Sequence, residues 1–176
     1  EPEILYYQIS ENLGREDLTE AKRLFSLLPK ESGFKDLSSV LFVLTEKTLG
    51  DAIEVFPEID TGDPIVDSES SILRLNVALQ ANDMELALSS MKRYHELNPK
   101  DNQRRLQYAH MLVNSSKESD AKSVIAPLIK SFPSNGLINE IASRIAYSEK
   151  KYKEAISYAS IATVSSPNAI MPRVVS

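Results

Sequence analysis

Three segments of equal length decide the fold: ALSSMKRYHELNP at 87–99, AKSVIAPLIKSFP at 121–133 and AISYASIATVSSP at 155–167. Each segment begins with Ala and ends with Pro, and both residue types recur at one fixed interval of about 34 residues, the repeat period. A fixed period of this size indicates a repeat architecture. A joint match of two residue types in three successive units is far stronger evidence than either residue type alone.

A second apolar segment precedes each of these, and a short polar break separates the two. The preceding segments are ILRLNVALQAND at 72–83, RLQYAHMLVNSS at 105–116 and INEIASRIAYSEK at 138–150. Apolar residues recur at helical spacing in both, so each unit is predicted to hold two helices of roughly a dozen residues. The small Ala lets the second helix approach the first closely, and the closing Pro cannot continue a helix.

Helix ends can also be predicted. Asp83 and Ser119 are expected to cap second helices, and Asp101 and Asn135 are expected to cap the first helices of the units that follow. Pro127 lies inside a predicted second helix, where it either bends the helix and shifts its hydrogen bonding or ends the helix early.

The pattern continues in a looser form toward the N-terminus, through LTEAKRLFSLLP at 18–29 and LGDAIEVFP at 49–57. Their prolines follow the alanines closely, which predicts truncated second helices. We therefore expect one domain over residues 1–176, made of repeat units. These units lie at 2–32, 33–66, 68–101, 102–135 and 136–167, and residues 168–176 form either part of a sixth unit or a cap.

These residues resemble the tetratricopeptide repeat family. The matching positions are Ala87, Met91 and Pro99, then Ala121, Ile125 and Pro133, then Ala155, Ala159 and Pro167. The family's first-helix aromatic is replaced by Ser71, Arg105 and Asn139, and its first-helix glycine by Leu75, Ala109 and Ser143. The match is close over 68–167 and loose over 2–66, and its divergence resembles that of bacterial members. The resemblance implies an all-α, right-handed superhelical solenoid of antiparallel helix pairs whose first helices line a concave groove.

The composition limits the class of protein. An apolar fraction of 42% with 26% charged residues excludes wholesale disorder. No apolar stretch approaches the roughly twenty residues of a membrane span. The absence of cysteine excludes disulfides, thiolate metal sites and a Cys nucleophile, and is compatible with the cytoplasm and the periplasm alike. The chain begins with Glu rather than Met, which predicts a fragment or a processed product.

Charge is distributed unevenly along the chain. Residues 1–67 hold 15 acidic and 6 basic side chains, whereas residues 68–176 hold 10 and 14. The segment EIDTGDPIVDSES at 58–70 lies at this change and is predicted to be a solvated linker between the loose and the regular units. Opposite charge at the two ends makes head-to-tail self-assembly one alternative function.

Candidate catalytic and metal-binding groups are few. Asp60-Thr61-Gly62 spells the aspartic-protease tripeptide, but that chemistry needs two such carboxylates, so a turn is the favoured interpretation. The acidic residues nearby do not fit a calcium loop, because Pro64-Ile65-Val66 interrupts them. The two histidines, His95 and His110, form no metal-binding motif, and His95 is expected at the surface near a helix end. We predict no enzyme activity, no metal and no cofactor.

Nucleic-acid binding is also disfavoured. It would need basic residues with interleaved aromatics on one face, and the repeat period places Tyr108 in the packed interior. The basic residues of the second half are therefore predicted to be solvated edges.

The resemblance places one stripe of first-helix residues in the concave groove. The stripe consists of Leu73, Asn76 and Gln80, then Gln103, Gln107, His110 and Asn114, then Glu140, Arg144 and Tyr147. Asn76, His110 and Arg144 occupy the same position in three successive units, so they are expected to stack as a ladder of groups that bond a peptide backbone. An ordinary solvated face is the alternative.

Some family members bind a partner's C-terminal carboxylate through paired Lys and Asn residues. The equivalent positions here are Ile72, Gln107, Leu137 and Ile141, and only Asn76 matches. This mode of binding is therefore not expected.

The predicted function is a non-catalytic protein–protein interaction module, or scaffold, that binds a segment of a partner protein in its groove. A weak homo-oligomer is expected at most, with no nucleic acid and no membrane span. The second alternative is a scaffold domain attached to an enzyme or an envelope protein elsewhere in a longer chain.

Overall fold

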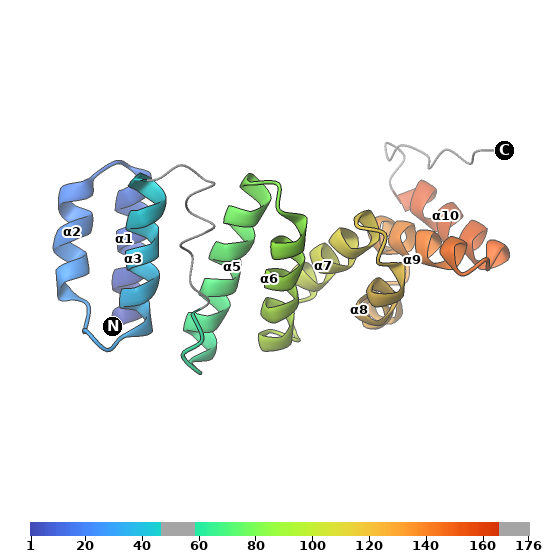
Figure 1. Cartoon of the computed structure of the whole chain (residues 1–176). Helices are drawn as coiled ribbons and strands as arrows, with labels where there is room; N and C mark the ends of the chain where they lie inside the picture. Colours follow the sequence, from blue (N-terminus) through green and yellow to red (C-terminus); the bar gives the residue numbers. More distant parts are fainter. Residues whose placement is uncertain (47–58, 166–176) are drawn as a thin grey trace. The chain divides into compact units, whose positions relative to one another are not determined.

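A computed structural model of the chain describes residues 1–46 and 59–165, and every regular element in these two ranges is an α-helix (Figure 1). The all-α class predicted from the sequence is therefore confirmed. Contacts between residues divide the chain into two compact units, Glu1–Asn98 and Pro99–Ser176. The grouping of the helices into five repeats of one domain stays a prediction.

The first unit contains α1 (Pro2–Gly14), α2 (Leu18–Leu27), α3 (Gly33–Glu46), α5 (Pro64–Gln80) and α6 (Met84–Leu97). Helix α1 packs against both α2 and α3, whereas α5 pairs with α6 and touches α3. Apolar side chains from α1, α2 and α3 form one core, to which Val66 and Val77 of α5 also belong. Tyr6 and Phe34 join α1 to α3 in this core, with their ring centroids 5.7 Å apart.

The second unit contains α7 (Asn102–Asn114), α8 (Glu118–Ser131), α9 (Gly136–Ser148) and α10 (Tyr152–Ser165). Helix α9 packs against the other three helices, and α7 also packs against α8. The core is built mainly from α7, α8 and α9, and its almost completely buried members include Ala109, Leu112, Ile125, Leu128 and Ile141. Helix α10 contributes Ala155.

The turn inside each helix pair that the structure describes in full has the same backbone geometry. One residue adopts a left-handed conformation and donates its N–H to the carbonyl three positions earlier, and the next residue donates to the carbonyl five positions earlier. This pair of bonds is the Schellman motif, which satisfies the last carbonyls of a helix. The left-handed residues are Glu16, Asn82, Ser116 and Lys150, and the last three recur at the repeat period. The repeat seen in the sequence is thus also a repeat of backbone conformation.

Three of the four predicted caps are confirmed. Asp83, Asp101 and Asn135 each accept a hydrogen bond from the backbone N–H three residues later, at 3.0–3.1 Å. The prediction for Ser119 was wrong, because the N-cap of α8 is Lys117, which makes no side-chain cap bond. The Schellman turn fixes the cap as the residue directly after Ser116, so Ser119 falls inside the first turn of α8.

The repeated alanines lie in the packed interior. Ala21, Ala87, Ala121 and Ala155 are all buried, three of them completely. Helix α8 continues through Pro127 to Ser131, so this proline does not end the helix early. Helix α2 ends at Leu27, two residues before Pro29, as the truncated second helix of the first unit predicts. The truncation predicted at Pro57 lies outside the described residues.

Polar side chains close the connection between helix pairs at two positions where the tetratricopeptide repeat family carries an aromatic. The Arg105 guanidinium donates to the carbonyl of Pro99, and the Asn139 amide donates to the carbonyl of Pro133, six residues earlier in each case. The two donors are one repeat period apart, and so are the two prolines. The carbonyl of the unit-ending proline is therefore bonded by the next first helix in the absence of the aromatic.

The predicted linker at 58–70 was wrong over most of its length, because α5 begins at Pro64 rather than near Ser68. The carboxylate of Asp63 accepts from the Ile65 N–H at 2.9 Å, and a proline after such a cap occupies the first helical position, where its missing N–H costs nothing. The Asp-Pro pair that resembles a turn is thus a helix start. Of the described residues, 59–63 form an irregular segment before α5, and Gly62 has a positive φ of 75° there.

Candidate functional site

The residues predicted to line a groove lie on the first helices of their pairs, and the two units each hold part of the set. In the first unit, Asn76 and Gln80 of α5 are exposed, whereas Leu73 is partly buried against the apolar core. Leu73 therefore has a packing role. The complete ladder of Asn76, His110 and Arg144 stays a prediction, because Asn76 belongs to a different unit from the other two.

In the second unit, three of the predicted residues form one hydrogen-bonded set that joins α9 to the end of α7. Arg144 donates from Nη1 to Oδ1 of Asn114 at 2.7 Å and from Nη2 to the carbonyl of Val113 at 3.2 Å. The Asn114 Nδ2 atom lies 3.3 Å from Nε2 of His110, one turn earlier on α7. A cation at the last carbonyls of a helix is favoured by the helix dipole.

The other predicted residues of the second unit surround this set. Gln107 accepts from the guanidinium of Arg104 at 2.9 Å, Gln103 is exposed, and Glu140 is half-buried. Tyr147 is 65% exposed, and its ring meets that of Tyr152 edge-on at 5.7 Å. The face formed by α7 and α9 is therefore polar, with one exposed aromatic pair at its edge. Tyr108 is buried, as predicted.

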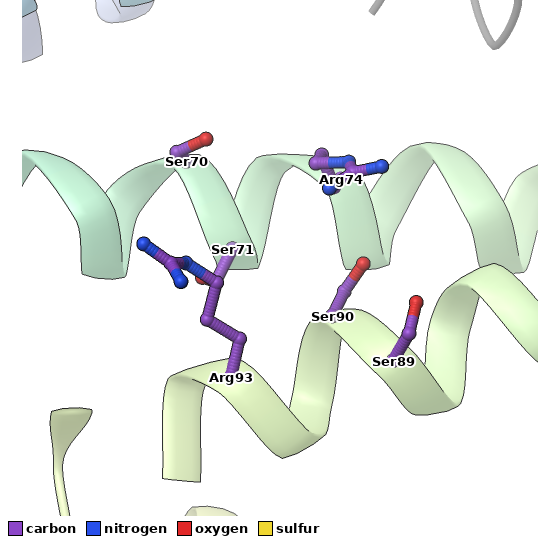
Figure 2. A pocket seen from close by; sticks show the side chains of 6 residues that line it. All are labelled: Ser70, Ser71, Arg74, Ser89, Ser90 and Arg93. Carbon is purple, nitrogen blue, oxygen red and sulfur yellow. The ribbon is translucent and has the colours of Figure 1, made fainter. Parts of the chain in front are cut away.

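A second polar site, which the sequence analysis missed, lies between α5 and α6 (Figure 2). It is a cavity of about 120 Å³ lined by Ser70, Ser71 and Arg74 of α5 and by Ser89, Ser90 and Arg93 of α6. Ser70, Ser71 and Ser90 are almost completely buried. A signal was present in the sequence, because Ser-Ser-x-x-Arg occurs at 70–74 and again at 89–93.

Arg93 connects this cavity to the segment before α5. Its Nη2 atom lies 2.8 Å from a carboxylate oxygen of Asp60 and 3.6 Å from one of Asp67. Asp67 is only 3% exposed, and its carboxylate accepts from the N–H and hydroxyl of Thr61 and from the N–H of Gly62. Burial alone would raise the pKa of Asp67, but the hydrogen bonds from Thr61 and Gly62 lower it below its ordinary value.

The buried carboxylate corrects the sequence-based interpretation of the acidic segment. Asp60, Asp63 and Asp67 are not merely solvated, since one pairs with Arg93, one caps α5 and one is buried as an acceptor. Within 1–46 and 59–165 no three acidic or histidine side chains gather as metal ligands. Over the same ranges no helix is long and apolar enough to cross a membrane.

Comparison with known proteins finds similarity only at the level of structure. No protein-family model matches the chain, and no curated protein matches its sequence. A solved structure of a mutant of the MamA protein is similar with a TM-score of 0.61 and 13% identity, covering 93% of this chain and 96% of that one. A crystal structure of MamA itself gives 0.56 and 14%, covering 98% and 99%.

MamA is a tetratricopeptide-repeat-like protein. This chain has a divergent fold of the same kind. The similarity extends over nearly the full length of both chains, which supports the helical-repeat architecture predicted from the repeat period. At 13–14% identity it concerns the fold alone, so the function has to be argued from the sites.

Proposed function

We propose that this tetratricopeptide-like chain is a non-catalytic protein-interaction module that holds a segment of a partner protein against the α7–α9 face. The observation that carries the proposal is the set formed by His110, Asn114 and Arg144, which brings an imidazole, an amide and a guanidinium together on adjacent first helices. Repeat folds present such side chains at regular spacing along an extended surface, which suits an extended or helical ligand.

The chemistry of this set suits a carboxylate or a backbone carbonyl. A guanidinium has five N–H donors, and Asn114 and Val113 each accept from Arg144. These two bonds fix the orientation of Arg144 before a partner arrives, which lowers the entropy cost of binding. Tyr147 is an exposed aromatic of the kind that often contributes strongly to protein interfaces.

The test is a pull-down from a lysate of the source with the wild type, an Arg144→Ala variant and a triple Asn76→Ala, His110→Ala, Arg144→Ala variant. Lys130→Ala on α8 is the matched control, because it removes one exposed charge from a second helix of the same unit. We expect Arg144→Ala and the triple variant to lose partners that Lys130→Ala retains.

Arg144 is half-buried and bonds α7, so its replacement also costs about 1–3 kcal/mol of stability. Melting temperatures must therefore accompany the pull-down. Retention of the same partners at equal strength by a folded triple variant would contradict the proposal.

Self-assembly is a second candidate, favoured by the charges of the two units. Glu1–Asn98 holds 19 acidic and 9 basic side chains, whereas residues 99–176 hold 6 and 11. The charge difference is therefore larger between the two compact units than between the halves compared in the sequence. The outer side of α10 also exposes Ile156 and Val164 in the basic unit.

A further inference from the structure

The two Ser-Ser-x-x-Arg motifs meet across the α5–α6 pair. A turn of three residues, 81–83, joins these tightly packed helices, so they run antiparallel. In an antiparallel pair, one motif is turned end for end relative to the other. Figure 2 shows the result: Arg93 lies beside Ser71, and Arg74 lies beside Ser90. Arg93 thus reaches toward Ser71 of the opposite helix, and Ser90 points from α6 toward the part of α5 that carries Arg74.

Arg93 is held in a fixed orientation at the edge of this cavity. Asp60 and Asp67 both meet its Nη2 atom, which anchors one end of the guanidinium. Its Nε atom is buried and has no hydrogen-bond partner among the described residues. A buried N–H without an acceptor costs about 1–3 kcal/mol, so an acceptor supplied by a ligand at this position would be strongly favoured.

The serine hydroxyls can turn toward such a ligand at little cost. Ser71 donates to the carbonyl of Asp67, and Ser90 donates to the carbonyl of Leu86, each one turn earlier in its helix. Helix carbonyls at these positions also accept the regular backbone bond, so a hydroxyl can rotate away without leaving a carbonyl unbonded. The cavity can therefore present guanidinium and hydroxyl donors together.

We propose that this cavity binds a small tetrahedral oxyanion of the phosphate or sulfate class. Guanidinium and hydroxyl groups are the donors that such ions prefer, and Arg74 and Arg93 supply the positive charge. Asp60 and Asp67 carry an equal negative charge, but both meet Arg93 at Nη2, and Thr61 and Gly62 donate to the Asp67 carboxylate. The hydrogen-bond donors that line the cavity, rather than its net charge, therefore favour the ion.

The size and walls of the cavity favour a free ion over a phosphorylated side chain. Its volume is about 120 Å³, and three of its four serines are almost completely buried. A free ion can enter this space entirely, whereas a phosphorylated residue would bring its own backbone to the buried wall. The inference is independent of the partner-binding face on α7 and α9.

The test is a titration of the ¹⁵N-labelled chain with sodium phosphate, against sodium chloride at equal ionic strength. We expect saturable shifts of backbone amides in residues 70–74 and 89–93. Arg93→Lys keeps a charge facing Asp60 but removes the Nε donor, and Arg74→Gln removes the second guanidinium. Each is expected to weaken phosphate binding about ten-fold or more. Sodium sulfate should give the same pattern of shifts.

Lys92→Gln is the matched control, because it removes one charge from the exposed side of α6 next to Arg93. It is expected to bind phosphate as the wild type does. An equal loss in Lys92→Gln and Arg74→Gln would show a general ionic effect and overturn the proposal, as would the absence of saturable shifts. Binding of phosphoserine without binding of inorganic phosphate would overturn the assignment to a free ion. If Arg93→Lys does not fold, the phosphate titration of Arg74→Gln tests the proposal.

Discussion

Replacing Asp67 by Asn should destabilise the first unit, although the two side chains have nearly the same shape. Asp67 is 3% exposed, and its two carboxylate oxygens have different partners. Oδ1 accepts from the N–H of Thr61 at 2.8 Å and from its hydroxyl at 3.0 Å, whereas Oδ2 accepts from the N–H of Gly62 at 3.2 Å and lies 3.6 Å from Arg93. An asparagine can keep its oxygen toward Thr61 only by turning its NH₂ group toward Gly62 and Arg93, which are both donors.

The magnitude follows from this count of bonds. The variant loses one hydrogen bond to a charged acceptor, worth about 1.5–3 kcal/mol, and places two donors against each other in a buried position. It also weakens the ion pair of Arg93, which keeps its closer partner Asp60. We expect a loss of about 2–3 kcal/mol in the free energy of unfolding, measured by urea denaturation at pH 7.

The matched control is Asp63→Asn, the same chemical change four residues earlier. Asp63 caps α5 from an exposed position, and Asn caps a helix about as well as Asp does. The control should therefore lie within about 0.5 kcal/mol of the wild type. Equal stability of the Asp67→Asn and Asp63→Asn variants would refute the assignment of Asp67 as a buried, fully bonded carboxylate.

The difference between the wild type and Asp67→Asn should depend on pH in one direction. The pKa of Asp67 is lowered in the folded chain, so its charged form adds stability above the unfolded pKa of about 4, and this stability is lost as pH falls through the folded pKa. The difference should be complete at pH 7 and shrink below about pH 4. A constant difference down to pH 3 would mean that the charge of Asp67 contributes nothing.

Three further outcomes are expected. Ala121→Leu places a large side chain at a completely buried helix crossing and should cost about 1–3 kcal/mol, whereas an unchanged melting midpoint would mean that the crossing lies elsewhere. Lys150→Gly should stabilise the second unit by about 0.5–1 kcal/mol, because Lys150 has a φ of 62°, which glycine adopts without steric cost. Lys153→Gly inside α10 should instead destabilise the unit by about 1 kcal/mol, because glycine disfavours the helix. Thermal unfolding of the two variants and the wild type measures both changes. Self-association measured by sedimentation should weaken between 0.01 and 0.15 M salt, as the Debye length falls from about 30 to 8 Å, and an oligomer insensitive to salt would indicate apolar contacts of α10 around Ile156.

The sequence predicted the class of fold and most helix ends, because these depend on local features that recur with the period. Helices α1, α3, α7 and α9 begin at Pro2, Gly33, Asn102 and Gly136, where the first helices were expected to begin. The sequence analysis misplaced the start of α5, because an Asp-Pro pair such as Asp63-Pro64 is found both in turns and at the N-termini of helices. In the folded chain Asp63 accepts from the Ile65 N–H and caps α5, which identifies the pair as a helix start.

The candidate sites were predictable to different extents. The period placed His110 and Arg144 on equivalent turns of neighbouring first helices, and Asn114 bonds both in the structure. Leu73, which the period also placed in the groove, is partly buried against the apolar core of the first unit. The cavity between α5 and α6 could not be found from the 34-residue period, since the motifs that line it do not recur at that period.

The residues that line this cavity do not recur at the 34-residue period. The positions equivalent to Ser70, Ser71 and Arg74 are Arg104, Arg105 and Tyr108 in α7 and Ile138, Asn139 and Ala142 in α9. Those equivalent to Ser89, Ser90 and Arg93 are Ser123, Val124 and Pro127 in α8 and Ser157, Tyr158 and Ile161 in α10. The helix pairs of the second unit fold without the motif, so the fold does not require it.

A feature that the repeat does not require needs a different physical reason for its presence. The buried guanidinium nitrogen of Arg93, which has no acceptor among the described residues, costs stability. A ligand that supplies acceptors offsets this cost, and local departures from the pattern of a fold are where function is expected. The same reasoning assigns the periodic alanines, prolines and left-handed turns to the fold, and the paired Ser-Ser-x-x-Arg motifs to binding.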